Sequence, residues 1–535
     1  MSDQSVTLAV VIIYFIIVIG VGYYFYHRST NLSDYILGGR SLNPYVTALS
    51  AQASDMSGWL LMGLPGSIYV AGMGQVWIGI GLAIGSYLAW LFIAKRLRIY
   101  SEKAKNSLTL SEYFENRFHD DTGALRTVSA VIILVFFTIY VASGFVGAGN
   151  VFRMIFPDFT YTAAMIIGAV VLIVYTFLGG FRAVCWTDLL QAILMIFAIV
   201  LVPLAAVNEL GGWDSTADIL DDMMSTGRAP DHFTSLLYSG GTGIAAATVI
   251  SCLAWGLGYF GMPHIIVRYT AIKNPADLKI SRRVATVWVV ICLAAACAMA
   301  IIGRAYISDS GTALDNPENI FIVLADSMFP AALAAIIYAA LLAAIMSTAD
   351  SQLLVASGAV SNDLYTHIFK KKADDRKLMW VARGVVIVIA VIAALLALDK
   401  DGAIMDLVSY AWAGFGAAFG PAVILSLYWK KTNAKGVMWG MATGFATVII
   451  WNTFFIAGGI IAGGDWLIWD SQLYELVPGF VLSFIVTVAV SVKTGGAGKE
   501  IEKEFDDYEA AVDDPDWGSD PKVSGPQTTL KEKGQ

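Results

Sequence analysis

AQASDMSGWLLMGLPG, residues 51–66, interrupts a long apolar segment in which an unbroken membrane helix would otherwise be expected. The stretch contains an acid, Asp55, and serine hydroxyls, and its Gly58 and Pro65 loosen the helical hydrogen bonding around them. An ionised carboxylate in hydrocarbon costs roughly 2.5–3.5 kcal/mol, so such an acid is usually kept because it binds something. The stretch therefore predicts a cation site in a loosened helix; the alternative is a kinked packing helix.

The composition around this stretch is that of a polytopic membrane protein. Of the 535 residues, 57% are hydrophobic and only 14% are charged, and the mean hydropathy is +0.67. Soluble domains carry about 25% charged residues. The N-terminus lacks the basic region and cleavage site of a signal peptide, so the first apolar span is expected to remain as a membrane helix.

Thirteen apolar stretches are long enough to cross about 30 Å of hydrocarbon, which predicts an all-α transmembrane domain over residues 1–495. Their approximate ranges are 6–26, 43–70, 75–94, 127–149, 161–180, 186–208, 241–262, 284–305, 324–356, 379–398, 404–428, 437–459 and 472–492. Gly and Pro interrupt both the second and the seventh span. Interrupted helices at corresponding places predict two inverted five-helix repeats, spans 2–6 and 7–11, with spans 1, 12 and 13 at the periphery.

Lys and Arg are concentrated in alternate connections, among them 95–126, 263–283 and 357–378. The bias of basic residues toward cytoplasmic loops then places the N-terminus outside and the C-terminus in the cytoplasm, as thirteen crossings require. Residues 496–535 are polar and acidic without apolar periodicity, which predicts a disordered cytoplasmic tail.

The seventh span offers groups that suit a small amphipathic solute. Trp255, Tyr259 and Pro263 are spaced by four, which predicts that they share one helix face, and glycines lie between them. Trp and Tyr combine an apolar ring with a polar tip. The alternative is an aromatic anchor at the membrane interface.

The ninth span offers oxygen ligands. Ala344, Ser347 and Thr348 lie at i, i+3 and i+4, hence on one face, and Asp350 adds an acid nearby. Two hydroxyls and a carbonyl suit Na⁺ better than a transition metal. The alternative is that the hydroxyls bond only to carbonyls of their own helix.

Two further residues carry weaker signals. Tyr140 is a single tyrosine among small residues of the fourth span. Asp188, in WTDLLQ, is a helix N-cap or an ion ligand, and the sequence alone favours the cap. The pair Gly81 and Gly85 has the spacing of close helix packing.

The chain contains no phosphate-binding glycine loop, no catalytic-triad pattern and no histidine cluster. We therefore expect neither an enzyme nor an ATP-driven pump, and neither ATP nor nucleic acid as a partner.

Four motifs together resemble the sodium:solute symporter family, and within it the branch that transports proline with sodium. They are ASDMSGW at 53–59, WTD at 186–188, WGLGYFGMPH at 255–264 and MSTADSQLL at 346–354, and the resemblance extends over about residues 5–495. It implies Na⁺-coupled uptake of L-proline by alternating access, in a bacterial cytoplasmic membrane and in contact with its lipid. Na⁺ would be the coupling ion, without an organic cofactor. The alternatives are a symporter for another solute (a vitamin, a sugar or another amino acid), a channel or a transport-linked sensor.

The resemblance also implies roles for individual residues. Na⁺ would be held by the backbone carbonyls of Ala53, Met56 and Ala344 and the hydroxyls of Ser347 and Thr348, and Asp55 matches an acid needed for sodium binding. The solute would be lined by Ser57, Gly58, Trp59, Tyr140, Trp255, Tyr259 and Pro263. Asp188 matches an acid that supports sodium use and that in some relatives lies near a second ion site.

Overall fold

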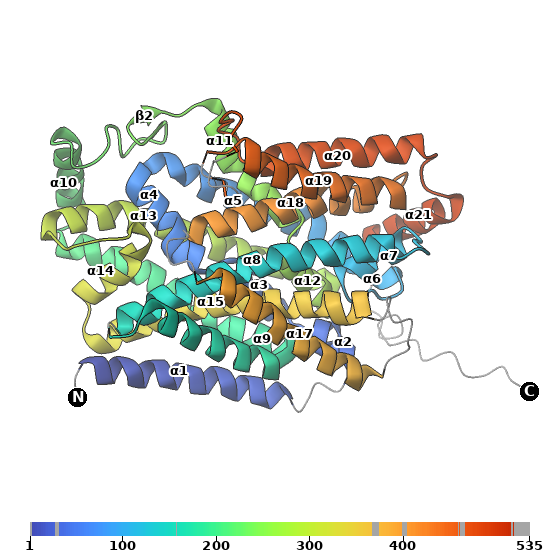
Figure 1. The fold of residues 1–535 in the computed structure, drawn as a ribbon, viewed down its shortest axis with the longest axis horizontal. Helices are drawn as coiled ribbons and strands as arrows, with labels where there is room; N and C mark the ends of the chain where they lie inside the picture. The colour runs from blue at the N-terminus through green and yellow to red at the C-terminus, as the bar shows by residue number, and fades with distance from the viewer. Residues whose placement is uncertain are drawn as a thin grey trace, which may run out of the picture.

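The computed structural model describes residues 3–26, 31–156, 158–365, 374–398, 404–457, 459–460, 466–514 and 517, almost all of them in or between helices (Figure 1). In this part of the chain ten helices are long and apolar enough to span a membrane, and one bent pair brings the number to eleven. The all-α polytopic architecture predicted from composition is therefore found. The predicted thirteen crossings also count a second broken helix and the first part of a very long helix.

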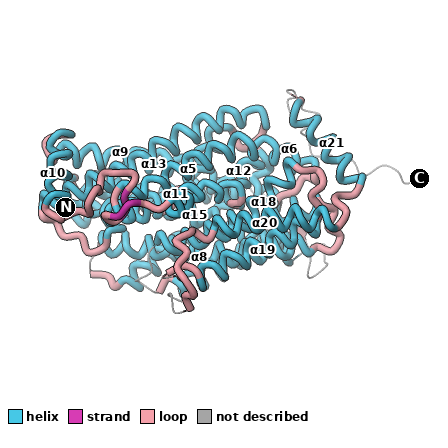
Figure 2. Tube along the Cα trace, turned by 90° about the horizontal axis from the view of Figure 1, so that it is seen from above, coloured by secondary structure: helices cyan, strands magenta, loops and turns pink. Residues whose placement is uncertain are grey.

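Most of the long helices lie roughly along one axis, and shorter helices connect them (Figures 1 and 2). In the first half of the chain they are α1 (Asp3–Tyr26), α2 (Leu32–Leu37), η1 (Gly38–Arg40), α3 (Pro44–Asp55), η2 (Trp59–Gly63), α4 (Leu64–Ala71), η3 (Met73–Gln75), α5 (Val76–Leu88), η4 (Ala89–Ala94), α6 (Lys95–Lys103), α7 (Leu110–Arg117), α8 (Ala124–Ile155), α9 (Tyr161–Glu209) and α10 (Trp213–Ser225). A two-stranded antiparallel hairpin follows, β1 (Tyr238–Ser239) and β2 (Thr242–Gly243), in which Tyr238 pairs with Gly243.

The second half begins with another series of short helices around a break. Its helices are α11 (Ala246–Ala254), η5 (Trp255–Phe260), α12 (Pro263–Ala271), η6 (Pro275–Asp277), α13 (Leu278–Ser310), η7 (Pro317–Asn319), α14 (Ile320–Met328), α15 (Ala331–Gly358), η8 (Ala359–Tyr365), α17 (Asp375–Leu396), α18 (Ile404–Tyr428), α19 (Ala434–Phe454), α20 (Leu476–Lys493) and α21 (Lys499–Asp513).

The helix that contains residues 51–66 is broken as predicted. Helix α3 starts with Asn43 as its N-cap and Pro44 in its first turn, and it ends at Asp55. Met56 leaves the helical conformation with φ −84° and ψ 76°, and η2 resumes the chain as a short π-helix before α4. The break falls at Met56–Gly58, so backbone groups there are freed from regular helical bonding.

A second break lies between α11 and α12, where the axis bends by 43°. Between them η5 is a 3₁₀ helix, and α12 begins at Pro263, whose missing N–H suits a first helical position. The predicted span of 241–262 was wrong here. The helix continues past Pro263 to Ala271, because the proline starts a new half-helix instead of ending the span.

Two predicted boundaries changed for similar reasons. The predicted span at 324–356 is divided, because Phe329 and Pro330 adopt extended backbone and separate α14 from α15. The predicted spans 161–180 and 186–208 both lie within α9. This long helix is kinked at Gly180, the last residue of the first of these spans. There φ is +63°, and a Cβ atom would lie 2.9 Å from the ring of Tyr35.

The core of the molecule lies around α15 and α18. In the most apolar part of these two spans, 78% and 83% of the residues are buried, whereas the corresponding fractions are 17% in α1 and 28% in α20. Helix α1 packs on α9 and α15 from one side, and α19 and α20 pair with each other beside α18. Among the ten spans, α1, α19 and α20 have the smallest buried fractions. These are the three helices that were predicted to lie at the periphery.

The two ends of the bundle carry different elements (Figure 1). One end carries α10, α14 and the β-hairpin, and we call it the α10 end. The other carries α6, α7 and α21, and we call it the α21 end.

Helix α21 differs from the sequence expectation for residues 496–535, which was a tail without regular structure. Residues Lys499–Asp513 form a helix that buries Phe505, Tyr508, Ala511 and Val512. The ring of Tyr508 stacks on Tyr100 of α6 with centroids 4.0 Å apart, and the guanidinium of Arg117 lies over Tyr100 and Phe505. Four apolar positions on one face of an otherwise acidic segment were sufficient for docking. Residues 515–516 and 518–535 lie outside the described part of the chain.

Candidate ion and solute site

Four of the six residues predicted to hold a cation meet where α15 passes the end of α3. The Ser347 hydroxyl donates to the Ala53 carbonyl at 2.7 Å and to the Ala344 carbonyl at 3.1 Å. The Thr348 hydroxyl reaches the same two carbonyls at 3.4 and 3.3 Å. We call Ala53, Ala344, Ser347 and Thr348 the oxygen cluster. Its four oxygens are neutral, buried and drawn from two helices, which is the ligand chemistry that a small hard cation requires.

The hydroxyls in this cluster do bond to their own helix, as the alternative interpretation expected, but they also bond across to Ala53. That second contact is what places them against the break. Met56, the third predicted backbone ligand, lies one turn beyond Ala53, directly after α3 ends.

Asp55 points from the end of α3 toward the other broken helix. Its carboxylate oxygen Oδ2 accepts a short hydrogen bond from the Tyr259 hydroxyl of η5, and the side chain is fully buried. The backbone carbonyl of Asp55 accepts from the indole N–H of Trp59 at 3.0 Å. Asp55 therefore connects the two broken helices, and it follows Ala53 of the oxygen cluster by two residues.

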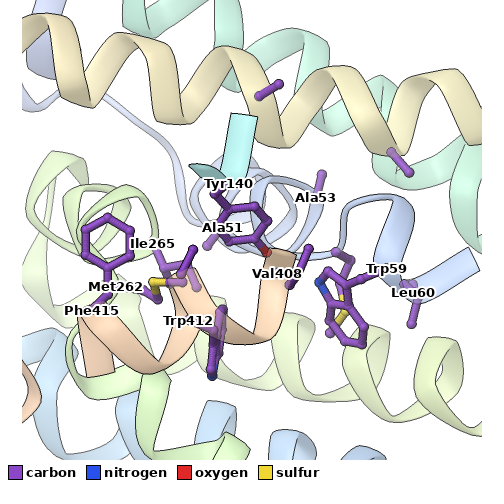
Figure 3. Close-up of a cluster of buried hydrophobic side chains, with 14 of the residues drawn as sticks. Ala51, Ala53, Trp59, Leu60, Tyr140, Met262, Ile265, Val408, Trp412 and Phe415 are labelled. Carbon is purple, nitrogen blue, oxygen red and sulfur yellow. The ribbon is translucent and has the colours of Figure 1, made fainter. Parts of the chain in front are cut away.

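The predicted solute residues of α3–η2 and α8 lie in one buried group. Figure 3 shows Trp59 and Tyr140 in the same cluster of buried side chains as Ala53 and Trp412. The backbone N–H of Trp59 donates to the Ser57 hydroxyl at 3.4 Å, and Gly58 packs on Ile345 of α15, where an added Cβ would lie 3.3 Å from Cγ1. The Tyr140 hydroxyl is buried and makes no hydrogen bond of normal geometry to the described residues.

Trp255, Tyr259 and Pro263 border the second break but do not share one α-helix face. Trp255 and Tyr259 belong to the 3₁₀ helix η5, and Pro263 begins α12 after the bend. The face prediction failed because it assumed 3.6 residues per turn through a segment that winds at three. Pro263 lines a mostly apolar cavity that extends to Asp363 at the α21 end.

Asp188 is not a helix cap, because α9 runs through it. Its Oδ2 accepts from the Ser50 hydroxyl of α3 at 2.6 Å and lies 3.2 Å from Nη2 of Arg268 in α12. Both charged side chains are fully buried.

Three residues of this region were missed by sequence reasoning. Trp412 of α18 donates its indole N–H to the Trp255 carbonyl at 2.7 Å and meets the Tyr259 ring edge-on at a centroid distance of 5.2 Å. Tyr474 stacks on Trp255 at 5.3 Å. Nothing in the local pattern around either aromatic marks it as part of a site. Arg268 was missed because it falls in the 263–283 connection, which was predicted to be a basic loop.

The sequence of residues 35–444 matches the model of the sodium:solute symporter family. The osmoregulated proline transporter OpuE of Bacillus subtilis is 43% identical over 493 residues, which cover 92% of this chain and 96% of that protein. The sodium/proline symporter of Escherichia coli is 41% identical over 514 residues, covering 95% and 97%.

Among solved structures, the fold is similar to that of a substrate-bound, outward-open Na⁺-coupled sialic acid symporter. The TM-score is 0.75 at 20% identity, over 92% of this chain and 99% of that one. A nucleobase-cation-symport-1 family transporter, Mhp1, aligns with a TM-score of 0.54 at 14% identity, over 89% and 98%. At these identities the likeness concerns the fold alone.

Proposed function

The chain belongs to the sodium:solute symporter family, and we propose that it couples the entry of Na⁺ to the uptake of L-proline by alternating access. The observation that carries this proposal is the oxygen cluster, in which α15 and the broken α3 meet around neutral oxygens. The relatives that match more than nine-tenths of the chain are proline transporters, which supports proline as the solute.

We propose that the membrane domain crosses the bilayer thirteen times, as two inverted five-helix repeats that begin with α3–α4 and α11–α12. Both proposed first helices are broken, which is typical of inverted-repeat transporters with their site at the midplane. The α10 end would face outward and the basic α21 end the cytoplasm of a bacterium. The N-terminus would then lie outside.

In this proposal Na⁺ binds to the carbonyls of Ala53, Met56 and Ala344 and the hydroxyls of Ser347 and Thr348. The hydroxyls now donate to Ala53 and Ala344, so they would turn their lone pairs to the ion when it binds. The ion would then fix the end of α3 against α15. Asp55 would contribute through its negative charge and its contact with Tyr259.

Proline is a zwitterion with an apolar ring. The ring would lie against the aromatic group of Trp255, Tyr259 and Tyr140, and the carboxylate would lie at the N-terminal end of η2, beside Ser57 and Gly58. Trp59 and Pro263 would complete the lining. None of these residues is basic, which disfavours an anionic solute.

The free energy released by Na⁺ entry is sufficient to accumulate proline from a dilute medium. One Na⁺ that moves down a tenfold gradient and about 100 mV releases about 3.7 kcal/mol. At about 1.4 kcal/mol per decade, this supports a few hundredfold accumulation at one ion per solute.

The decisive experiment is uptake of labelled proline into proteoliposomes with and without an inward Na⁺ gradient. We expect uptake only with the gradient, and competition by unlabelled proline but not by sugars or vitamins. Stimulation by a proton gradient alone, or Na⁺ current without solute, would replace the proposal by proton coupling or by a channel.

A further inference from the structure

Arg268 and Asp188 form an ion pair in the interior of the helix bundle. Nη2 of Arg268 lies 3.2 Å from Oδ2 of Asp188, and neither side chain is exposed to solvent. Two charges removed from water are costly unless their contact geometry is good and further hydrogen bonds satisfy them. This pair therefore needs supporting contacts, and the structure supplies them.

Hydrogen bonds extend the pair to four helices. The Arg268 guanidinium in α12 donates from Nε to the Ser50 hydroxyl of α3 at 3.1 Å and from Nη2 to the Ser351 hydroxyl of α15. Ser50 in turn donates to Asp188 of α9 at 2.6 Å, and Nη1 of Arg268 donates to the His264 carbonyl at 2.6 Å. We call Arg268, Asp188, Ser50 and Ser351 the Arg268 cluster.

The Arg268 cluster lies one helical turn from the oxygen cluster, on the side of the α21 end. Ser351 donates to the Ser347 carbonyl at 2.7 Å, and Ser347 donates to Ala53. Ser50 precedes Ala53 by three residues in α3. An ion that fixes α3 against α15 at the oxygen cluster therefore also aligns the two hydroxyls that hold the guanidinium.

The face of α12 that lacks Arg268 has free space beside it. Pro263, Ile266, Val267 and Thr270 line the cavity that extends toward Asp363. These residues recur with helical spacing on one face, while His264 and Arg268 lie on another. A movement of α12 into this cavity would carry Arg268 away from Asp188.

We propose that Arg268 is a positioning residue whose cluster holds the two half-helices α3 and α12 against α9 and α15, and that this cluster must open before Na⁺ and solute leave toward the α21 end. The inference rests on the proposed function for the direction of transport. In it Asp188 acts as the partner of a tethered cation, not as a Na⁺ ligand. Asp350, which accepts from Ser351 at 3.2 Å, is the other acid at the cluster.

The test measures access to α12 from the α21 end. Thr270→Cys, in a background without the four native cysteines, is alkylated in inside-out vesicles by a membrane-impermeant maleimide, with and without Na⁺. In the parent protein we expect Na⁺ to slow alkylation. Arg268→Gln should raise the rate in saturating Na⁺ about tenfold and abolish the protection by Na⁺, which a merely structural defect would not do selectively.

Three further variants test whether Asp188 and Arg268 act together. Asp188→Asn should have the same effect, and Asp188→Asn with Arg268→Gln should show about the single-variant rate, because coupled residues are not additive. Multiplied effects would contradict the cluster. Arg283→Gln, an exposed arginine of α13, is the matched control and should leave the rate unchanged.

Ser351→Ala covers the case in which the charge variants fail to fold, because it removes the hydrogen bonds of one hydroxyl and leaves the Arg268–Asp188 ion pair in place. We expect a two- to threefold faster alkylation in Na⁺; an unchanged rate in well-folded Ser351→Ala protein overturns the proposal. The readout needs no solute. Absence of proline uptake alongside Na⁺-sensitive alkylation would therefore reject only the solute assignment.

Discussion

Asp55 joins the two broken helices through one side chain, since it ends α3 and accepts from Tyr259 in η5. Its carboxylate is thus within reach of both the ion and the solute in the proposed mechanism. We expect Asp55→Asn to raise the Na⁺ concentration for half-maximal proline uptake at least tenfold, because the field that attracts the cation is lost. Uptake titrated with Na⁺ measures this. Asp309→Asn, at an exposed position, should match the parent, and an unchanged Na⁺ requirement in Asp55→Asn removes Asp55 from the site.

Thr348→Val tests the oxygen cluster without changing side-chain volume much. The variant loses one of the hydroxyls that reach Ala53 and Ala344. We expect about a tenfold higher Na⁺ requirement, equivalent to about 1.4 kcal/mol, with unchanged thermal stability. Thr176→Val is the matched control, because that buried hydroxyl bonds to the Leu172 carbonyl of its own helix. Equal effects of the two substitutions would mean that Thr348 serves only its helix.

For single residues, the sequence predicted the contacts that depend on local spacing along a helix. It missed the contacts that form only when distant helices pack together. The i, i+3, i+4 pattern placed Ser347 and Thr348 on one face, and the structure turns that face to Ala53. Trp412 could not be found, since its role comes from the packing of α18 against η5, and its partner Trp255 lies 157 residues away in sequence. The sequence alone favoured a helix cap at Asp188, because its partner Arg268 lies 80 residues away in the chain.

Where η5 crosses α5, glycines on both helices allow the two backbones to approach closely. A Cβ on Gly85 would lie 2.2 Å from the Gly256 carbonyl oxygen, and one on Gly256 would lie 2.3 Å from that of Gly81. The predicted packing role of the Gly81 and Gly85 pair thus has a specific partner, the second broken helix. Only residues without a side chain permit this backbone approach.

We expect Gly85→Ala to push α5 and η5 apart, with a cost of about 1–3 kcal/mol and a loss of most transport, because Trp255 and Tyr259 shift with η5. Thermal melting in detergent and proline uptake measure the two effects. Gly384→Ala in α17, where an added Cβ meets nothing within 4 Å, should behave as the parent does. A variant with normal uptake would show that the crossing tolerates separation.

Element types could be predicted better than element ends. Long apolar runs identified the spans, whereas the breaks depend on whether a new helix starts at a proline. Pro263 starts α12, and Pro330 precedes α15 after an extended residue. Hydropathy does not distinguish these cases, because the residues on both sides are apolar.

For the whole molecule, α21 ties the end of the chain to the α21 end of the bundle. Besides the stacking of Tyr508 on Tyr100, the Lys95 ammonium donates to the Val512 carbonyl at 2.6 Å, and Lys430 lies 3.2 Å from Asp506. The exposed ion pair contributes little by itself, so the buried rings account for most of the docking.

Tyr508→Ala should therefore release α21. We expect its backbone amides to lose most of their protection from hydrogen exchange, while those of α15 keep theirs. Asp507→Ala, at an exposed position of the same helix, is the control and should retain protection. Protection that survives in Tyr508→Ala would assign the docking to the charged contacts instead.

The cavity beside α12 has a consequence for inhibition. A compound that filled it would hold α12 in place from the α21 end, outside the aromatic residues of the proposed proline site. Such an inhibitor would lower the maximal rate of uptake. The walls of the cavity are mostly apolar and include the polar side chains of Ser107, Thr109 and Asp363, so a small apolar molecule with one hydrogen-bond donor would suit it.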